Sequence, residues 1–186
     1  NPNLTSSSQT AIESAVRSTM ETHFENNLGE FDKSFRRSNL LTDIDETDAS
    51  VLSSRSTIRM QNRFTPQSGT TNYTIIFPSS IAAAEEESNT ITSSNFFFKG
   101  KVCTLRNRSN SSTIEVVDTA GNVVRDNIGS YDPTSGSIVL SGFTGSLISG
   151  TYFKITALPA NQATINPLRN NILNYDASSS SARAVI

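Results

Sequence analysis

The sequence has one cysteine, one histidine and no tryptophan. A single cysteine, Cys103, can form neither a disulfide within the chain nor a thiolate cluster around a metal ion. The single histidine, His23, would have to serve any Ser-His-Asp or Cys-His-Asn triad, yet it lies in a helical pattern far from any turn that could present a nucleophile. We therefore expect no catalytic residues, no metal site and no cofactor.

Long apolar runs and a strong charge imbalance are also missing. No run approaches the roughly 20 apolar residues that cross a membrane, and no basic-then-apolar signal segment opens the chain. Fifteen Lys and Arg stand against 17 Asp and Glu, which gives a net charge of −2. This balance gives no general reason to expect nucleic acid or an anionic membrane. The expected partners are proteins rather than nucleic acid, membrane or a small-molecule substrate.

Two helices are predicted near the start of the chain. Apolar residues at four-residue steps predict a helix over residues 10–28, with Gly29 as a plausible stop. A second, short helix fits residues 39–47, with Ser38 as its N-cap and an inward-facing apolar set. The apolar residues of the two helices are Ile12, Val16, Met20, Phe24 and Leu28, then Leu40, Leu41 and Ile44.

The rest of the chain has the pattern of strands. Residues 51–64 alternate with period two and, after turn chemistry at 66–69, residues 71–77 do so again, which predicts a long hairpin. From Asn95 onward, turn signals about every 8 to 12 residues mark antiparallel strands. The predicted fold class is therefore α+β: two N-terminal helices followed by antiparallel β hairpins and a β-rich subdomain.

The same pattern predicts a division of the chain. We expect residues 1–80 to form a helix-helix-hairpin domain, with 159–176 as a segment that could return to complete it. Residues 81–158 are expected to form an antiparallel β subdomain, and 177–186 a tail.

Residues 43–47, DIDET, match the D-x-D-x-T letters of haloacid-dehalogenase-type phosphatases. That chemistry needs its aspartates at the carboxyl end of a buried parallel strand. Here the preceding letters, KSFRRSNLLT, are charged and polar. On a helix Asp43 and Asp45 would point roughly 200° apart and could not share a metal ion. We interpret these acids as a solvated helix end rather than a phosphatase site.

Six residues are candidates for a protein interface. Arg55, Arg59 and Arg63 would lie on one face of a strand, each roughly 13 Å from the next. They fit a solvated face, a contact with an acidic protein, or nucleic acid. Phe96, Phe97 and Phe98 can all be buried on a strand only if both faces are covered, which favours a packed core or a subunit contact.

Three stretches together resemble a known family. They are HFENNLGEFDKSFRRSNLLTDIDETDASVLSSRSTIRMQNRFTP at 23–66, DNIGSYDPTSGSIVLSGF at 126–143, and ALPANQATINPLRNNILNYD at 157–176. In their order and spacing they are similar to baseplate wedge proteins of contractile-tailed phages. The chain most resembles the C-terminal part of the large ring-forming wedge subunit of T-even-type myoviruses and their cyanophage relatives, in the baseplate-J-like group.

The resemblance implies a structural role without catalysis. Subunits of this kind associate with themselves into a ring around the tail hub and bind neighbouring wedge proteins. They reside in the tail baseplate of the virion after assembly in the host cytoplasm. The alternative is a β-rich tail or adhesin module that binds glycan, with Tyr131 or Tyr152 as an aromatic platform. The absence of tryptophan argues against that alternative.

Overall fold

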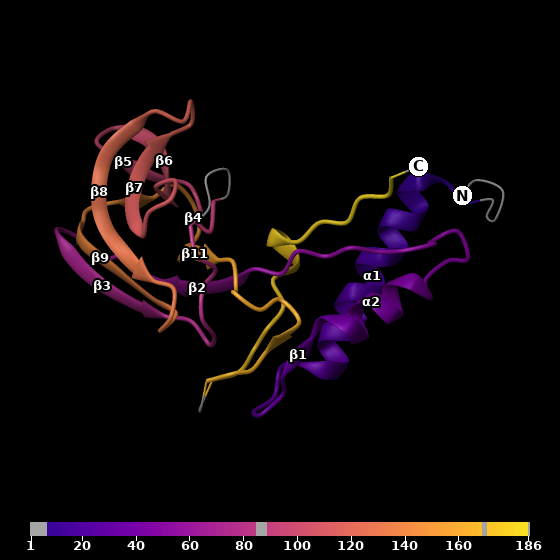
Figure 1. The fold of residues 1–186 in the computed structure, drawn as a ribbon. Helices are drawn as coiled ribbons and strands as arrows, with labels where there is room; N and C mark the ends of the chain where they lie inside the picture. Colours follow the sequence, from indigo (N-terminus) through magenta and orange to yellow (C-terminus); the bar gives the residue numbers. More distant parts are fainter. Residues whose placement is uncertain (1–6, 85–88, 169–170, 186) are drawn as a thin grey trace. The chain divides into compact units, whose positions relative to one another are not determined.

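The computed structural model describes residues 7–84, 89–168 and 171–185. The chain divides into two units (Figure 1). The first unit is made of residues 1–57 and 162–186, and the second of residues 58–161. The second unit is therefore inserted into the sequence of the first.

The first unit holds two helices, a small sheet and one turn of 3-10 helix. These are α1 (Gln9–Asn27), β1 (Phe35–Arg36), α2 (Arg37–Asp45), β12 (Thr164–Ile165) and η1 (Ala177–Ser179). The hydroxyl of Ser8 caps α1 by accepting a hydrogen bond from the backbone N–H of Ala11. β1 and β12 pair antiparallel, so a C-terminal strand joins the chain between the two helices.

The core of the first unit depends on residues from both ends of the sequence. The ring of Phe24, on α1, stacks on Phe35 at 5.6 Å and on Tyr175 at 4.4 Å between centroids. Stacked aromatic pairs contribute about 0.5–1.5 kcal/mol beyond the area that they bury. Leu40 and Ile44 are buried on α2. The C-terminal segment is thus part of this core.

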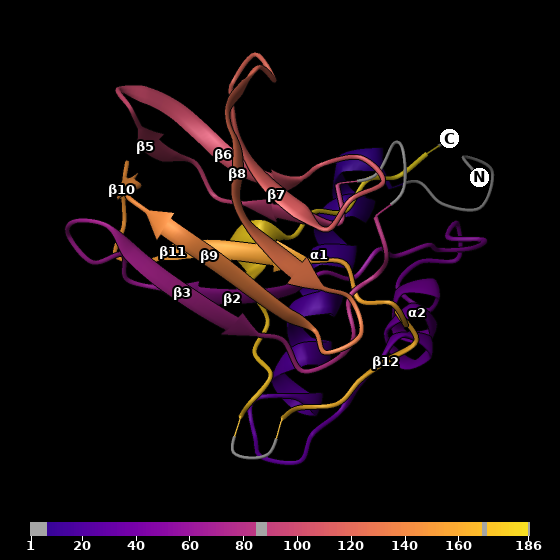
Figure 2. The ribbon, with the colours of Figure 1, turned by 60° about the vertical axis from the view of Figure 1, so that its left-hand side comes forward.

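The second unit is one antiparallel sheet of ten strands that curls into a nearly closed barrel (Figure 2). The strand order is β2-β11-β4-β6-β7-β8-β9-β3, with β5 between β6 and β10. The strands are β2 (Met60–Phe64), β3 (Thr71–Ile76), β4 (Ile91–Ser93), β5 (Phe96–Phe98), β6 (Lys101–Asn107), β7 (Thr113–Asp118), β8 (Val123–Asp132), β9 (Ser137–Phe143), β10 (Ser146–Leu147) and β11 (Phe153–Ala157).

The two end strands, β2 and β3, meet through side chains rather than through a backbone ladder. The rings of Phe64 and Tyr73 stack with centroids 4.3 Å apart. The amide of Asn62 donates to the carbonyl of Ile76 at 3.4 Å. Inside the barrel, the fully buried rings of Phe96, Phe143 and Phe153 lie 5.2 to 5.4 Å from one another. Aromatic side chains therefore fill the interior of the barrel and also hold β2 against β3.

Two hairpin turns are fixed by aspartates. The carboxylate of Asp118 accepts hydrogen bonds from the backbone N–H groups of Ala120 and Asn122. That of Asp132 accepts from the Ser135 hydroxyl and the Thr134 N–H. Because these bonds favour the charged carboxylates, they hold the pKa of both below its usual value. The resulting stabilisation is present above the unfolded-state pKa and is lost as the pH falls through the depressed folded-state pKa.

The α+β prediction is wrong, because the protein is mostly β-sheet. The helices lie close to the predicted ranges, but β1 separates them, so a single N-terminal helix precedes the first strand. The predicted hairpin of 51–64 with 71–77 is also wrong, since β2 pairs with β11 and β3 with β9. Turn chemistry favours pairing of neighbours in sequence, whereas closing this sheet places them at its two ends.

The units divide the chain at different points from the predicted domains. Residues 58–80, expected in the first domain, lie in the second unit because their strands pair with β9 and β11. Residues 162–186 lie in the first unit. Within the expected tail, Ala184 accepts a hydrogen bond from the side chain of Gln9 and donates one to the carboxylate of Glu13, each at 2.9 Å.

Gly129 generates the first prediction. A Cβ at this position on β8 would lie 2.0 Å from the backbone carbonyl oxygen of Val139, in the paired strand β9. Backbone cannot yield as a flexible side chain can, so we expect Gly129→Ala to lower the free energy of unfolding by about 3 kcal/mol. Urea unfolding followed by far-ultraviolet circular dichroism measures the loss. The control, Ser130→Ala at the exposed next position, should change it by under about 0.5 kcal/mol. Equal effects would contradict this explanation.

Candidate functional site

A polar groove lies between α1 and α2. His23 is 5% exposed, and its Nδ1 lies 2.5 Å from Oδ2 of Asp43. The groove has a volume of about 450 Å³. Hydroxyl and amide side chains make up most of the remaining lining, which consists of Ala15, Ser18, Thr19, Thr22, Asn26, Asn27 and Thr47.

The groove combines one imidazole and one carboxylate that already bind each other. The hydroxyls of Thr19 and Thr47 lie 3.0 Å apart, which adds a second polar contact between the two elements. Among the described residues no group of three or more His, Cys, Asp or Glu could hold a metal ion. The arrangement therefore fixes one helix against the other and contains no activated nucleophile in the described part of the chain.

The acids of the DIDET motif have different surroundings. Asp45 and Glu46 are exposed, as a solvated helix end requires, but Asp43 is half-buried against His23. They lie on or directly after α2, and every strand pair in the described residues is antiparallel. The site geometry of the phosphatases, at the end of a parallel strand, is thus missing from the described structure. The His23–Asp43 pair was missed because it joins residues 20 positions apart that no motif connects.

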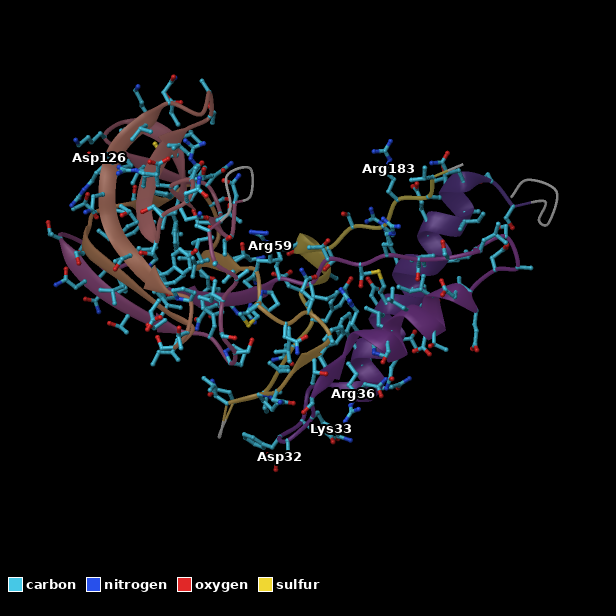
Figure 3. The ribbon with its side chains drawn as sticks, viewed as in Figure 1. Asp32, Lys33, Arg36, Arg59, Asp126 and Arg183 are labelled. Carbon is cyan, nitrogen blue, oxygen red and sulfur yellow. The ribbon has the colours of Figure 1, made fainter. Side chains whose placement is uncertain are left out.

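The three arginines do not form one row on a strand. Arg55 is exposed and belongs to the first unit, whereas Arg59 precedes β2 and only Arg63 lies on it. The guanidinium of Arg59, labelled in Figure 3, donates to the carbonyls of Asn89 and Thr90. That of Arg63 lies 5.6 Å from the ring centre of Tyr152. Arg59 therefore anchors a loop, while Arg55 and Arg63 remain at the surface.

The three phenylalanines of β5 alternate in exposure. Phe96 and Phe98 are buried in the barrel, whereas Phe97 is 42% exposed and pairs with Ser146 on β10. Exposed Ile148 follows two residues after Ser146. Of this run, only Phe97 is available to another molecule.

The tyrosines suggested for glycan binding differ in accessibility. Tyr131 is buried, and its hydroxyl donates to the carbonyl of Ala82 at 3.3 Å. Tyr152 is 50% exposed, but the guanidinium of Arg63 already lies over its ring. Of the two tyrosines suggested for glycan binding, only Tyr152 therefore has its ring at the surface.

A buried ion network on the second unit was also missed from the sequence. Glu115 is 4% exposed. Its carboxylate lies 2.8 Å from Nε of Arg106 on the paired strand and 3.6 Å from Nε of Arg108. Arg106 and Glu115 lie opposite each other on β6 and β7. Their pairing can be predicted only when the register of the two strands is known. The buried carboxylate therefore has charged partners within the sheet, and removing them would leave an unpaired buried charge.

Cys103 lies inside the barrel and is fully buried. Burial, with a smaller contribution from the carboxylate of Asp118, raises the pKa of its thiol above the usual value. The reactive form of cysteine is the thiolate. This thiol is accordingly an inert core group.

The helix groove generates the second prediction. Asp43→Ala removes the partner of a buried imidazole, so we expect the free energy of unfolding to fall by about 1–2 kcal/mol. Urea unfolding followed by the helical circular dichroism signal measures it. Asp45→Ala, on the same helix but exposed, is the matched control and should change it by under about 0.5 kcal/mol. If the control loses as much, the His23–Asp43 contact contributes nothing.

Comparison with known protein families gives information on function that the geometry of the groove does not give. Residues 1–63 match the family described as baseplate structural protein gp6, C-terminal domain III. No curated protein matches the chain. The match spans α1, β1, α2, the segment leading into β2 and all of β2 except its last residue, Phe64. A structural family argues against an enzyme and supports interaction with other baseplate proteins. The match supports a phage baseplate structural protein and, with it, a location in the tail baseplate of the virion.

Proposed function

We propose that this chain is part of the large ring-forming wedge subunit of a T-even-type or cyanophage-like contractile-tailed phage. In this role it self-associates into a ring around the tail hub and binds neighbouring wedge proteins. The observation that carries the proposal is the match of residues 1–63 to a baseplate structural domain. Those residues include most of the longest stretch, 23–66, on which the resemblance to wedge subunits rests.

The accessible members of the candidate interface, on each unit by itself, are available for contact with another molecule. Of the six residues, Arg55, Arg63 and Phe97 have exposed side chains that are free to meet a partner. Arginine and aromatic residues are enriched where protein interfaces gain most of their affinity. Because Phe96 and Phe98 are fixed in the core, β5 holds Phe97 in a rigid position. A rigid anchor loses little entropy when a partner covers it.

The first test is the molar mass of the purified chain by light scattering over about a hundredfold range of concentration. We expect a discrete dimer or a larger closed species, since a specific interface buries about 1,000 Å² or more. A strict monomer at every concentration would contradict self-association by this chain.

Substitutions then test the surface. Phe97→Ser combined with Arg63→Ser should weaken the association at least tenfold, because it removes an aromatic anchor and a guanidinium. Val139→Ser is the matched control, since Val139 is similarly exposed (40%) on β9 of the same sheet. If the control weakens the association as strongly, the contact lies elsewhere on the sheet.

A further inference from the structure

A small polar cavity lies at the N-terminal end of α2, within the first unit. Its volume is about 190 Å³. Ligands of drug size occupy cavities of about 300 Å³ or more, whereas a water molecule takes up about 30 Å³ in the liquid. The cavity is therefore of a size for a small ion with a few water molecules. Its polar lining residues are His23, Asn27, Lys33, Ser34, Arg36 and Asn39.

The N-terminus of α2 lacks the groups that usually stabilise this end of a helix. The positive end of the helix dipole favours an acidic residue, and the first-turn N–H groups favour an N-cap side chain that accepts a hydrogen bond. The N-cap of α2 is Arg36, whose guanidinium has donors only, and the first turn contains no acidic residue. By comparison, Ser8 caps α1 through its hydroxyl. An anion at the N-terminus of α2 would supply both the missing charge and the missing acceptor.

Two cationic side chains stand beside this helix end. Lys33 and Arg36, both labelled in Figure 3, are exposed and line the cavity. In the described part of the chain, Arg36 has no carboxylate within ion-pair distance. Nζ of Lys33 lies 3.7 Å from Oε2 of Glu30, but an exposed pair of this kind is weak and is screened by salt. The cavity therefore carries an excess of positive charge.

His23 adds a polar atom at the buried side of the cavity. Its side chain is 4% exposed, and its Nδ1 donates to the carboxylate of Asp43, which lines the larger groove but not this cavity. Nε2, on the other side of the ring, has no hydrogen-bond partner among the described residues. It is not fully enclosed, because the enclosed side-chain atoms without a partner in that part of the chain are the hydroxyls of Ser54 and Ser56. Nε2 is therefore the ring nitrogen left to meet a ligand in the cavity.

We infer that this cavity binds a small oxyanion, either inorganic phosphate or the carboxylate of an Asp or Glu side chain from a neighbouring protein. Lys33 and Arg36 hold its negative charge at the rim, and the first-turn N–H groups of α2 donate to its oxygens. At the buried side, Nε2 of His23 accepts from the hydroxyl of hydrogen phosphate when the ring is neutral, or donates to an oxygen when the ring is protonated. The site lies within one copy of the chain, so the inference does not depend on self-association.

The chain contains one histidine, so its imidazole signals in nuclear magnetic resonance report on this cavity without overlap. Titration with sodium phosphate at fixed pH and ionic strength should shift the nitrogen signal of Nε2 saturably, with a dissociation constant below about 10 mM. Sodium acetate, titrated in the same way, distinguishes the two sources of the anion. Phosphate binding about tenfold tighter than acetate supports the free ion, and equal or tighter acetate binding supports the carboxylate of a partner. A shift that saturates with neither ion would overturn the inference.

Substitution of the cations tests where the anion binds. Lys33→Gln with Arg36→Gln removes both cations and should raise the phosphate dissociation constant at least about tenfold. The matched control, Arg17→Gln with Arg183→Gln, removes two exposed arginines of the same unit that do not line the cavity. It should leave the constant within about twofold, because distant exposed charges are screened. If the control weakens binding as much, the attraction is general and the inferred site is wrong.

His23→Asn tests the buried contact. The shorter amide keeps a donor near the position of Nδ1 for Asp43 but has no group at the position of Nε2. We expect the phosphate affinity, measured by calorimetry, to fall at least about fivefold, since one polar contact to the anion is lost. Far-ultraviolet circular dichroism checks that the helices remain folded. An unchanged affinity in the folded variant would overturn the contact between His23 and the anion.

Discussion

The second unit depends on a single constraint, which is that its main path of strands, from β2 to β3, must protect its two end strands. Backbone ladders satisfy every interior strand, but β2 and β3 have no further neighbour in the strand order. The stack of Phe64 on Tyr73 and the bond from Asn62 to the Ile76 carbonyl bring these edges together. The rings of Phe96, Phe143 and Phe153 then fill the interior that this closure creates. An open sheet would expose both edges to association with other chains.

The first unit depends on contacts between distant parts of the sequence. Two helices of this length alone bury too little apolar surface to form a stable core. Phe24 gains its second aromatic neighbour, Tyr175, only from the far end of the sequence, and β12 completes the sheet begun by β1. The polar groove between α1 and α2 is held by His23, the residue before Phe24, and Asp43. Aromatic stacking at Phe24 and a polar pair at His23 thus fix α1 within the unit.

Short sequence patterns predicted where helices and strands lie, but they did not predict which residues distant in the sequence would pair. The stripe from Ile12 to Leu28 placed α1, since a helix buries one face of its own sequence. Alternation also located strands, yet it carries no information on partners, so β2 and β3 were joined as a hairpin. The same limit hid the His23–Asp43 pair and the Glu115 network. The prediction of three arginines in a row on one strand was wrong because the period-two pattern continues through residues 51–59, which pair with no strand in the described structure.

The insertion of one unit within the other has a consequence for biosynthesis. All residues of the barrel-like sheet, 58–161, are synthesised before Thr164, Ile165 and Tyr175 exist. Contacts of such high sequence separation form late, and domains generally fold as units during synthesis. The sheet can therefore close while the helical unit still lacks part of its core. The helical unit therefore gains the last part of its core only after every residue of the sheet has been synthesised.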